Sequence, residues 1–205
     1  MADDGLEGCV ARGRVGAVSA RGLFLDRDGV INHEIGYLVR PEDVRFVPGI
    51  FSLCRTARRL GYRIFVVTNQ AGIGRGLYSE EEYQSLMGWM RGEFAREGVE
   101  LDGVYHSPYH PEHGLGEYKR EHEDRKPGPG MLLRGAREFG VELQESVMVG
   151  DRCSDVGAAN AAGLLRMFLL RGTEERGCDG AYVEVDGLEV VERWLVERDE
   201  ECMRG

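Results

Sequence analysis

Short runs of consecutive apolar residues alternate along the chain with segments in which apolar residues recur every three or four positions. Apolar runs predict buried strands at 23–25, 64–67 and 147–149, and further strands near Val104, at 167–170 and at 182–185. Helical spacing predicts helices over 49–60, 79–94, 131–139, 154–162 and 188–197. Strands that alternate with helices in this way are typical of βαβ units, so we expect an α/β fold with a mostly parallel sheet.

The N-terminal residues predict a short tail that precedes one folded domain. The first 21 residues are rich in Gly and Ala and lack the basic-then-apolar order of a signal peptide. We expect a flexible tail over residues 1–21 and a single domain over residues 22–205, because about 100–200 residues make one domain. No apolar stretch approaches the roughly 18 residues of a membrane span. Residues 106–126 show no periodicity and are interpreted as a loop.

The composition is that of an ordinary globular protein with an acidic balance. The 205 residues are 42% hydrophobic and 30% charged, which leaves enough apolar material for a core. The 26 Lys and Arg against 36 Asp and Glu give a formal net charge of -10. We therefore expect neither nucleic acid nor a membrane as a partner, since both are bound by basic patches. A local basic pocket for a small phosphorylated metabolite remains compatible with this charge.

The cysteines give little sign of a shared role. The five residues are scattered, odd in number and contain no Cys-x-x-Cys pair: Cys9, Cys54, Cys153, Cys178 and Cys202. This pattern predicts neither a disulfide framework nor a four-thiolate zinc site. It favours a reducing, cytoplasmic setting.

Polar side chains stand at the carboxyl ends of three predicted strands. Asp26 and Asp28 follow the first run, Thr68 and Asn69 the second, and Asp151 the third. The carboxyl ends of parallel strands share one edge of a sheet, so these residues are expected to meet. Two carboxylates at i and i+2 repel each other unless a cation offsets their charge, and Mg²⁺ suits oxygen ligands. Taken alone, Asp-x-Asp-Gly is more often a turn whose aspartates cap backbone amides.

Four motifs in order change this interpretation. The sequence LFLDRDGVIN, followed by VVTNQ, RKP and VGDRCSD, resembles the haloacid-dehalogenase phosphatases over about residues 22–196. Longer stretches, VVTNQAGIGRG and MVGDR among them, are similar to the D-glycero-D-manno-heptose 1,7-bisphosphate phosphatases, with the histidinol-phosphate phosphatases as close relatives. The resemblance implies a Rossmann-like haloacid-dehalogenase fold, a mostly parallel sheet flanked by helices, and no separate cap domain.

The resemblance also implies catalytic roles. Asp26 would be the nucleophile that forms an aspartyl-phosphate, and Asp28 would be the general acid and then the general base. Mg²⁺ would be held by Asp26, by the main-chain carbonyl of Asp28 and by Asp151. Thr68 would bind the phosphoryl oxygens, and Lys126 would stabilise the charge on the phosphoryl group and on Asp26. An ionised carboxylate is a competent nucleophile toward a phosphoryl group whose charge is screened.

The implied substrate contacts lie in loops. Arg125 would reach a second anionic group, because its planar fork suits phosphate oxygens, and Arg152 is a further candidate for a phosphate contact. Asp155 would orient the metal shell or Lys126, or cap a helix. The remaining expected contacts are Glu34, Ile35, Gly36, Tyr37, Asn69, Gln70 and Ala71.

One segment departs from the heptose bisphosphate phosphatases. Many of them hold a structural zinc through a Cys-x-His pair and a Cys-x-Cys pair, and the matching positions here are Ser107, Tyr109, His122 and Asp124. Because three thiolates are missing, zinc is not expected at these positions. A differently built site stays open, since four histidines lie in this segment: His106, His110, His113 and His122.

Together these features predict a monomeric, cytoplasmic, Mg²⁺-dependent phosphatase for a small phosphorylated metabolite. The resemblance makes the 7-phosphate of D-glycero-D-manno-heptose 1,7-bisphosphate the leading substrate. Histidinol phosphate, or a broader range of sugar phosphates, is the alternative, and the acidic Glu34 would suit an amine. A phosphoacceptor signalling module would use similar residues, but the spacing of Asp26, Asp28 and Gly29 argues against it.

Overall fold

The centre of the fold is one sheet of six parallel strands, which the computed structural model describes within residues 20–172 and 177–204. The expected tail lies outside these ranges except for its last two residues. Ala20 bridges to Val141, and Arg21 is the first residue of a strand. The strands are β1 (Arg21–Leu25), β2 (Tyr62–Asn69), β3 (Gly103–Ser107), β4 (Val147–Gly150), β5 (Arg166–Leu170) and β6 (Val183–Val185).

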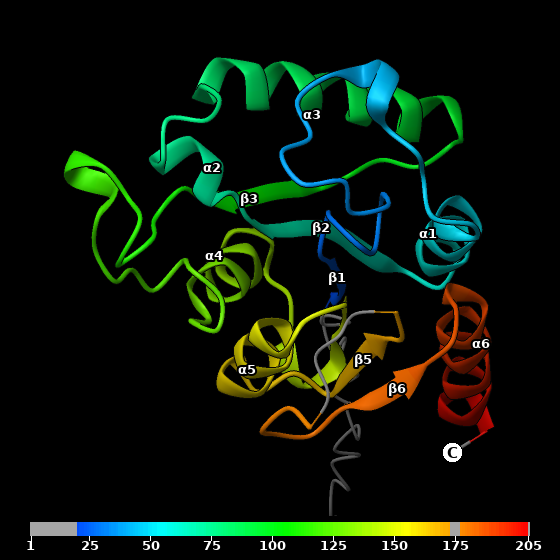
Figure 1. Ribbon diagram of the computed structural model, residues 1–205. Helices are drawn as coiled ribbons and strands as arrows, with labels where there is room; N and C mark the ends of the chain where they lie inside the picture. Colours follow the sequence, from blue (N-terminus) through cyan, green and yellow to red (C-terminus); the bar gives the residue numbers. More distant parts are fainter. Residues whose placement is uncertain (1–19, 173–176, 205) are drawn as a thin grey trace, which may run out of the picture.

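The strand order places β1 in the middle of the sheet. The order is β3-β2-β1-β4-β5-β6 and every neighbouring pair is parallel (Figure 1). In the register, Leu23 lies opposite Ile64 of β2 and Val147 of β4. The chain builds outward from β1 to β3 and then returns to begin β4 on the other side. Such a reversal leaves a crevice at the carboxyl ends of the central strands. The expected parallel α/β fold is confirmed.

Helices cover both faces of the sheet (Figure 1). The side chains of Leu23 and Leu25 belong to the apolar cluster beneath α1, α3 and α6, whereas Phe24 belongs to the cluster beneath α4 and α5. Successive strand residues point to opposite faces, so a continuous apolar run is what a strand covered on both sides requires. The helices are α1 (Ile50–Arg59), α2 (Ala71–Gly74), α3 (Glu80–Arg96), α4 (Gly130–Phe139), α5 (Cys153–Ala162) and α6 (Leu188–Arg204).

Some boundaries differ from the expectation at polar positions. β2 continues through Thr68 and Asn69, and these pair with His106 and Ser107 of β3, which had been interpreted as the start of a loop. Strand ends that carry polar side chains give no apolar signal, although their backbones complete the ladder. The glycine-rich segment after β2 contains the short helix α2, and α6 continues to Arg204. Other predicted boundaries hold: Ser79 caps α3 in the expected capping box with Glu82.

The connections of the sheet hold no additional folded unit within the described residues. Residues 26–49 link β1 to α1 and contain only the single 3-10 turn Pro41–Asp43. Residues 108–129 link β3 to α4 and contain only Gly116–Tyr118. The carboxyl edge of the sheet is therefore covered by loops, as expected for a fold without a cap domain. None of the described helices has the length and apolar character needed to cross a membrane.

The cysteine prediction was wrong in one respect, because Cys153 and Cys178 form a disulfide. Their Cα atoms lie 5.0 Å apart, although the residues are 25 positions apart in sequence. The chain that follows β5 returns to the first turn of α5, and only this tertiary contact brings the two thiols together. Cys54 is a free, buried cysteine.

Candidate active site

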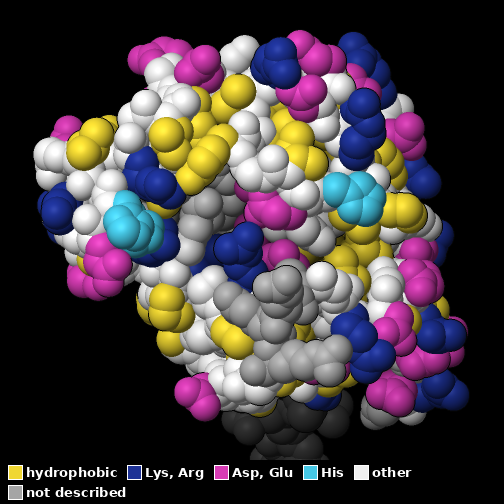
Figure 2. Space-filling model, in the orientation of Figure 1, with side chains coloured by type: hydrophobic (Ala, Val, Ile, Leu, Met, Phe, Trp, Pro, Cys, Tyr) yellow, Lys and Arg dark blue, Asp and Glu magenta, His cyan; other side chains and the backbone are white. Residues whose placement is uncertain are grey.

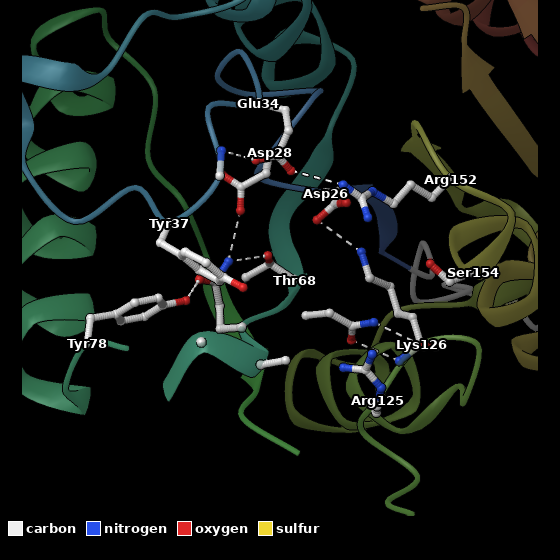
Figure 3. Close-up of a pocket in the computed structure, with 15 residues that line it drawn as sticks. Asp26, Asp28, Glu34, Tyr37, Thr68, Tyr78, Arg125, Lys126, Arg152 and Ser154 are labelled. Atoms are coloured by element: carbon white, nitrogen blue, oxygen red, sulfur yellow. Dashed lines mark hydrogen bonds and ion pairs between the residues drawn. The ribbon is translucent and has the colours of Figure 1, made fainter. Parts of the chain in front are cut away.

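A cavity of about 620 Å³ opens at the carboxyl edge of the sheet. Figure 3 shows its side chains converging from β1, from β2 and from the segments before α4 and α5. The space-filling view shows a hollow in the face of the molecule that is turned toward the viewer, where Lys and Arg side chains lie beside Asp and Glu side chains (Figure 2). The cavity brings together these residues that the sequence singled out: Asp26, Asp28, Glu34, Gly36, Tyr37, Thr68, Asn69, Gln70, Ala71, Arg125, Lys126 and Arg152.

Two expected site residues do not line this cavity. Ile35 points to solvent with 53% of its side chain exposed. Asp151 instead lines an adjoining cavity of about 520 Å³, together with Gly29 and Glu34. Glu34 lines both cavities and therefore stands between them. The substrate contact expected of Ile35 remains a prediction.

Gly29 explains how the first motif approaches Asp151. Its φ of +88° lies in the left-handed region, which favours glycine. A Cβ atom at this position would lie 2.1 Å from Oδ2 of Asp151, far inside van der Waals contact. The backbone amide of Asp26 donates to the carbonyl of Val149 at 3.0 Å and extends the pairing of β1 with β4. The turn at Gly29 and the pairing of β1 with β4 thus bring the ends of these two strands together, and the carboxylates of Asp26 and Asp151 lie close to each other.

Three buried carboxylates meet at this point. Oxygens of Asp26, Asp151 and Asp155 all lie within 4.8 Å of one another. Burial raises the pKa of Asp26 to about 7, helped by Asp155 and Asp28 and opposed by Lys126. Burial, with Asp26 and Asp155 nearby, raises the pKa of Asp151 to about 8. Mutual repulsion in a buried, all-oxygen cluster is the environment that a divalent cation such as Mg²⁺ relieves, so these residues fit the expected metal.

Asp155 has a role that the sequence left open between three possibilities. Its Oδ2 accepts from the backbone amides of Asp151, at 3.1 Å, and Arg152, at 3.0 Å. Its Oδ1 lies 2.5 Å from Nζ of Lys126. A Cβ atom on Gly150 would lie 2.3 Å from Cβ of Asp155, so the strand end needs glycine to admit this side chain. Asp155 therefore both caps the start of α5 and orients Lys126.

Lys126 is a buried cation held on all sides. Its Nζ lies 3.0 Å from Oδ1 of Asp26 and donates to the carbonyl of Val67 at 2.9 Å. Burial alone lowers the pKa of Lys126, but the Asp155 and Asp26 carboxylates outweigh this and raise it. Asn69 clamps the Lys126 backbone with two hydrogen bonds of 3.0 Å, one to the carbonyl and one from the amide. The amide of Asn69, expected to contact substrate, is thus engaged in placing Lys126.

Asp28 is surrounded by donors. Arg27 Nε donates to both Asp28 oxygens at 3.1 Å, and Arg27 Nη2 donates to Oδ2 at 2.7 Å. Asn32 donates to Oδ1 at 3.0 Å. Arg27 is almost fully buried, with its guanidinium carbon 5.7 Å from the ring centre of Tyr83. Sequence reasoning missed Arg27, because an arginine between two aspartates is usually a solvated charge.

A chain of hydrogen bonds links Asp28 to residues of β2 and beyond (Figure 3). Gln70 Nε2 donates to Asp28 Oδ2 at 3.0 Å and to Thr68 Oγ1 at 2.8 Å. The hydroxyl of Tyr78 donates to Gln70 Oε1 at 2.6 Å. Tyr78, which sequence reasoning also missed, lines the cavity and is almost fully buried. The only signal for it was the run of glycines before it: a Cβ atom on Gly72 would lie 2.1 Å from Cε1 of Tyr78.

The mouth of the cavity carries further charges. Glu34 Oε2 lies 3.1 Å from Nη2 of Arg152, and Glu34 Oε1 accepts from the amide of Gly36 at 2.7 Å. Arg125 is half-buried, donates to the carbonyl of Tyr109 at 2.9 Å, and has its pKa lowered by burial. Two cations, Arg125 and Arg152, thus join Lys126 around one cavity, an arrangement suited to an anionic ligand.

The four positions that the sequence comparison matched to zinc ligands hold Ser107, Tyr109, His122 and Asp124, and the last three of them pack in a polar cluster. The ring of Tyr109 stacks on that of His122 at 3.9 Å. Asp124 lies 3.9 Å from His122 and 3.2 Å from Arg134, while Ser107 is buried in β3. Within residues 20–172 and 177–204, the one group of His, Cys, Asp or Glu arranged for a metal is Asp26, Asp151 and Asp155. That zinc does not bind in segment 106–124 stays a prediction.

Comparisons with known proteins agree with this geometry. A family model described as HAD-hydrolase-like matches residues 124–188. A D-glycero-alpha-D-manno-heptose-1,7-bisphosphate 7-phosphatase of Burkholderia mallei is 54% identical over 150 residues, covering 73% of this chain and 79% of the relative. A D-glycero-beta-D-manno-heptose-1,7-bisphosphate 7-phosphatase of Vibrio cholerae is 46% identical, covering 85% and 95%. The crystal structure of the D,D-heptose 1,7-bisphosphate phosphatase of B. bronchiseptica, complexed with magnesium and phosphate, is similar with a TM-score of 0.75 and 26% identity, covering 87% and 99%.

Proposed function

Because this chain belongs to the haloacid-dehalogenase-like family of D-glycero-D-manno-heptose-1,7-bisphosphate 7-phosphatases, we propose that it hydrolyses the 7-phosphate of that sugar bisphosphate with Mg²⁺ as cofactor. The observation that carries the proposal is the carboxylate of Asp26, 3.0 Å from Lys126 Nζ and within a cluster of three buried carboxylates. This cluster stands at the edge of a cavity that two further cations line.

Asp26 and Asp28 would share the reaction. Asp26 attacks the phosphorus, the bond to the sugar oxygen breaks, and Asp28 gives its proton to the departing sugar oxygen. Asp28 then takes a proton from water, whose oxygen attacks the phosphorus of the aspartyl-phosphate. The bond from phosphorus to Asp26 breaks, and inorganic phosphate leaves. The two carboxyl groups have separate partners: Asp26 faces Lys126, whereas Asp28 faces the donors of Arg27, Asn32 and Gln70, which would stabilise the charge that Asp28 gains once it has given up its proton.

The remaining polar groups would stabilise charge on the phosphoryl group. Thr68 Oγ1 and Lys126 Nζ both border the cavity at the end of β2 and would bind phosphoryl oxygens. Asp26, Asp151 and the main-chain carbonyl of Asp28 would hold Mg²⁺, which supplies positive charge next to the phosphoryl oxygens when it is bound. Both oxygens of Asp155 are already engaged with Lys126 and with two backbone amides, so Asp155 would position these groups.

A sugar that carries two phosphates suits this cavity better than an amine does. Arg125 and Arg152 both line the cavity and would bind the phosphate that does not react, since Lys126 is engaged at the carboxylate cluster. Glu34 was the residue that favoured an amine such as histidinol phosphate. Its carboxylate is engaged by Arg152 and by the amide of Gly36. Because Glu34 is paired with Arg152, its carboxylate would be a poor partner for an amine, and Arg125 adds a positive charge to the same cavity.

Phosphate release from a panel of esters tests the proposal. The panel holds both anomers of the heptose 1,7-bisphosphate, because relatives named for each anomer are similar to this chain, together with the 1-phosphate, the 7-phosphate and histidinol phosphate. Phosphorus NMR identifies which ester is cleaved. We expect loss of the 7-phosphate from a bisphosphate with the highest kcat/KM of the panel, and no turnover by Asp26→Asn. Preferred cleavage at the 1-position, or of histidinol phosphate, would exclude the proposed substrate.

We propose three further properties: the domain organisation of the protein, its oligomeric state and its location in the cell. Residues 22–205 would act as one catalytic domain, because the described residues that line the cavity are gathered around the carboxyl edge of one sheet. The protein would act as a monomer. A single species of about 23 kDa in light scattering would agree with this. We also propose a cytoplasmic location, since a highly charged sugar bisphosphate does not cross a hydrocarbon core unaided. The Cys153–Cys178 disulfide would then be reduced in the working enzyme.

A further inference from the structure

Gln70 was expected to contact the substrate, but its side chain is engaged within the protein. Gln70 is 2% exposed, and its side chain makes three hydrogen bonds, all to side chains that line the cavity. Oε1 accepts from Tyr78, and Nε2 donates to Asp28 and Thr68. The amide therefore stands between the two side chains that would act on the leaving group and on the phosphoryl oxygens.

The chemistry of its neighbours fixes which end of the amide faces which partner. Oδ2 of Asp28 already accepts a hydrogen bond of 2.7 Å from Arg27 Nη2, so this oxygen is an acceptor and the end of Gln70 that faces it is the NH₂ group. The oxygen then faces Tyr78, and burial raises the pKa of Tyr78 to about 12, so that its hydroxyl stays protonated and donates. Gly72 leaves the space that the Tyr78 ring occupies. The orientation of Gln70 is thus determined at both ends.

This orientation has a consequence for Thr68. One hydrogen of the Gln70 NH₂ group is directed to Asp28, and the other is directed to Thr68 Oγ1 at 2.8 Å. A hydroxyl that accepts a hydrogen bond on one side has its own proton free for another direction. Thr68 is buried and lines the cavity, so this proton is free to point into the cavity, where the phosphoryl oxygens of a substrate would lie.

We infer that Gln70, oriented by Tyr78, is a positioning residue that holds the carboxyl group of Asp28 and directs the hydroxyl proton of Thr68 toward the phosphoryl group. The inference rests on the proposed phosphatase activity and adds to it a hydrogen-bonded unit, Tyr78–Gln70–Asp28/Thr68 (Figure 3). Neither Gln70 nor Tyr78 has to touch the substrate for this role.

Two substrates with different leaving groups distinguish a positioning role of Gln70 from a merely structural role. A sugar alkoxide needs a proton as it departs, whereas p-nitrophenolate departs without one. Misplacing Asp28 therefore slows the release of a sugar far more than the release of p-nitrophenolate, while misdirecting Thr68 slows both. Single-turnover release of the leaving group is the quantity to measure, because it reports attack by Asp26 and excludes the later hydrolysis of the aspartyl-phosphate.

Gln70→Met keeps the length of the side chain and removes its hydrogen bonds. We expect the single-turnover rate to fall about 100-fold on the sugar bisphosphate and about 10-fold on p-nitrophenyl phosphate, with KM within about twofold. In Tyr78→Phe the single-turnover rate should fall less, about 10-fold on the sugar bisphosphate and about threefold on p-nitrophenyl phosphate. The Gln70 amide remains in this variant, but no hydroxyl group fixes its orientation. The smaller change in Tyr78→Phe keeps the test usable if Gln70→Met does not fold.

Tyr105→Phe is the matched control. Tyr105 on β3 also donates a hydrogen bond of 2.6 Å, to Glu138 of α4, and its exposed fraction of 8% equals that of Tyr78. Tyr105 does not line the cavity, so the single-turnover rates of Tyr105→Phe should match those of the wild type on both esters.

Equal losses on the two esters in Gln70→Met and Tyr78→Phe would overturn the role at Asp28. A raised KM with an unchanged single-turnover rate would show a substrate contact and also overturn it. Absence of phosphatase activity in the wild type would overturn the proposed function itself.

Discussion

The ammonium nitrogen of Lys126 lies 3.0 Å from Oδ1 of Asp26. Both side chains are buried, so solvent screens their attraction only weakly. Burial raises the pKa of Asp26 to about 7 even with this cation beside it. Lys126 therefore opposes the effect of burial and favours the ionised form of the proposed nucleophile, and Asn69 and Asp155 hold Lys126 in place.

Lys126→Met keeps the aliphatic stem and removes the charge. We expect kcat/KM to fall about 100–1000-fold, by a similar factor on a sugar bisphosphate and on p-nitrophenyl phosphate, because Lys126 acts on the phosphoryl group that both share. Phosphate release measures the loss, and Lys119→Met, in the same segment, serves as the control that should leave it unchanged. Activity within about tenfold of the wild type would contradict the assigned role.

Magnesium should stabilise the protein more at high than at low pH. In the folded metal-free protein the pKa values of Asp26 and Asp151 are raised to about 7 and about 8. An unfolded aspartate titrates near pH 4, so the folded state binds more protons than the unfolded state between about pH 4 and about pH 8. The free energy of unfolding of the metal-free protein therefore falls as the pH rises through this window.

Mg²⁺ competes with those protons, and so the increase in Tm that it causes should be larger at about pH 8 than at about pH 5.5. Differential scanning fluorimetry with and without Mg²⁺ measures both values. Asp151→Asn removes one repelling carboxylate, and we expect a higher Tm without metal at the upper pH and a smaller response to Mg²⁺. An equal response of the wild type at the two pH values would speak against a metal at this cluster.

Arg125→Ala should discriminate between substrates with one and two phosphates. In the proposed reaction, the reacting phosphate would have Lys126 and Thr68 as its partners, which would leave Arg125, another residue of the cavity, for the phosphate that does not react. A charged hydrogen bond contributes about 1.5–3 kcal/mol, so kcat/KM on the bisphosphate should fall roughly 10–100-fold further than on the 7-phosphate. Arg120→Ala is the control, since Arg120 lies in the same segment and its guanidinium packs on Tyr109. Equal losses on both substrates would place Arg125 at the reacting phosphate.

Reduction of the Cys153–Cys178 disulfide should leave the catalytic reaction in place. Asp151 and Arg152, which precede Cys153, are also held by the side chain of Asp155, and this contact does not depend on the disulfide. We expect kcat to change less than about threefold in dithiothreitol, and Tm to fall, because a cross-link of this kind stabilises by about 2–4 kcal/mol. Cys178→Ser should behave as the reduced wild type does. Loss of turnover on reduction would contradict the proposed cytoplasmic location.

The sequence by itself determined the layered fold and the position of the catalytic edge. Apolar runs such as Leu23–Leu25 are long enough to fill both faces of a covered strand, and the polar residues after them mark the strand ends. Residues such as Asp26, Thr68 and Asp151 could be assigned to one site because parallel strands deliver their carboxyl ends to one edge. Ordered motifs supplied the remaining assignment, since Arg125 and Lys126 carry no periodic signal of their own.

Tertiary structure alone decided how these side chains are held. Arg27 and Tyr78 stand just outside the apolar run 23–25 and the predicted helix 79–94, and only the folded chain buries them against Asp28 and Gln70. The same applies to the disulfide of Cys153 with Cys178, which a return of the chain after β5 creates. Periodicity along a chain reports which face of an element is buried. Hydrogen bonds between side chains depend on distances between elements, and those distances exist only once the sheet has formed.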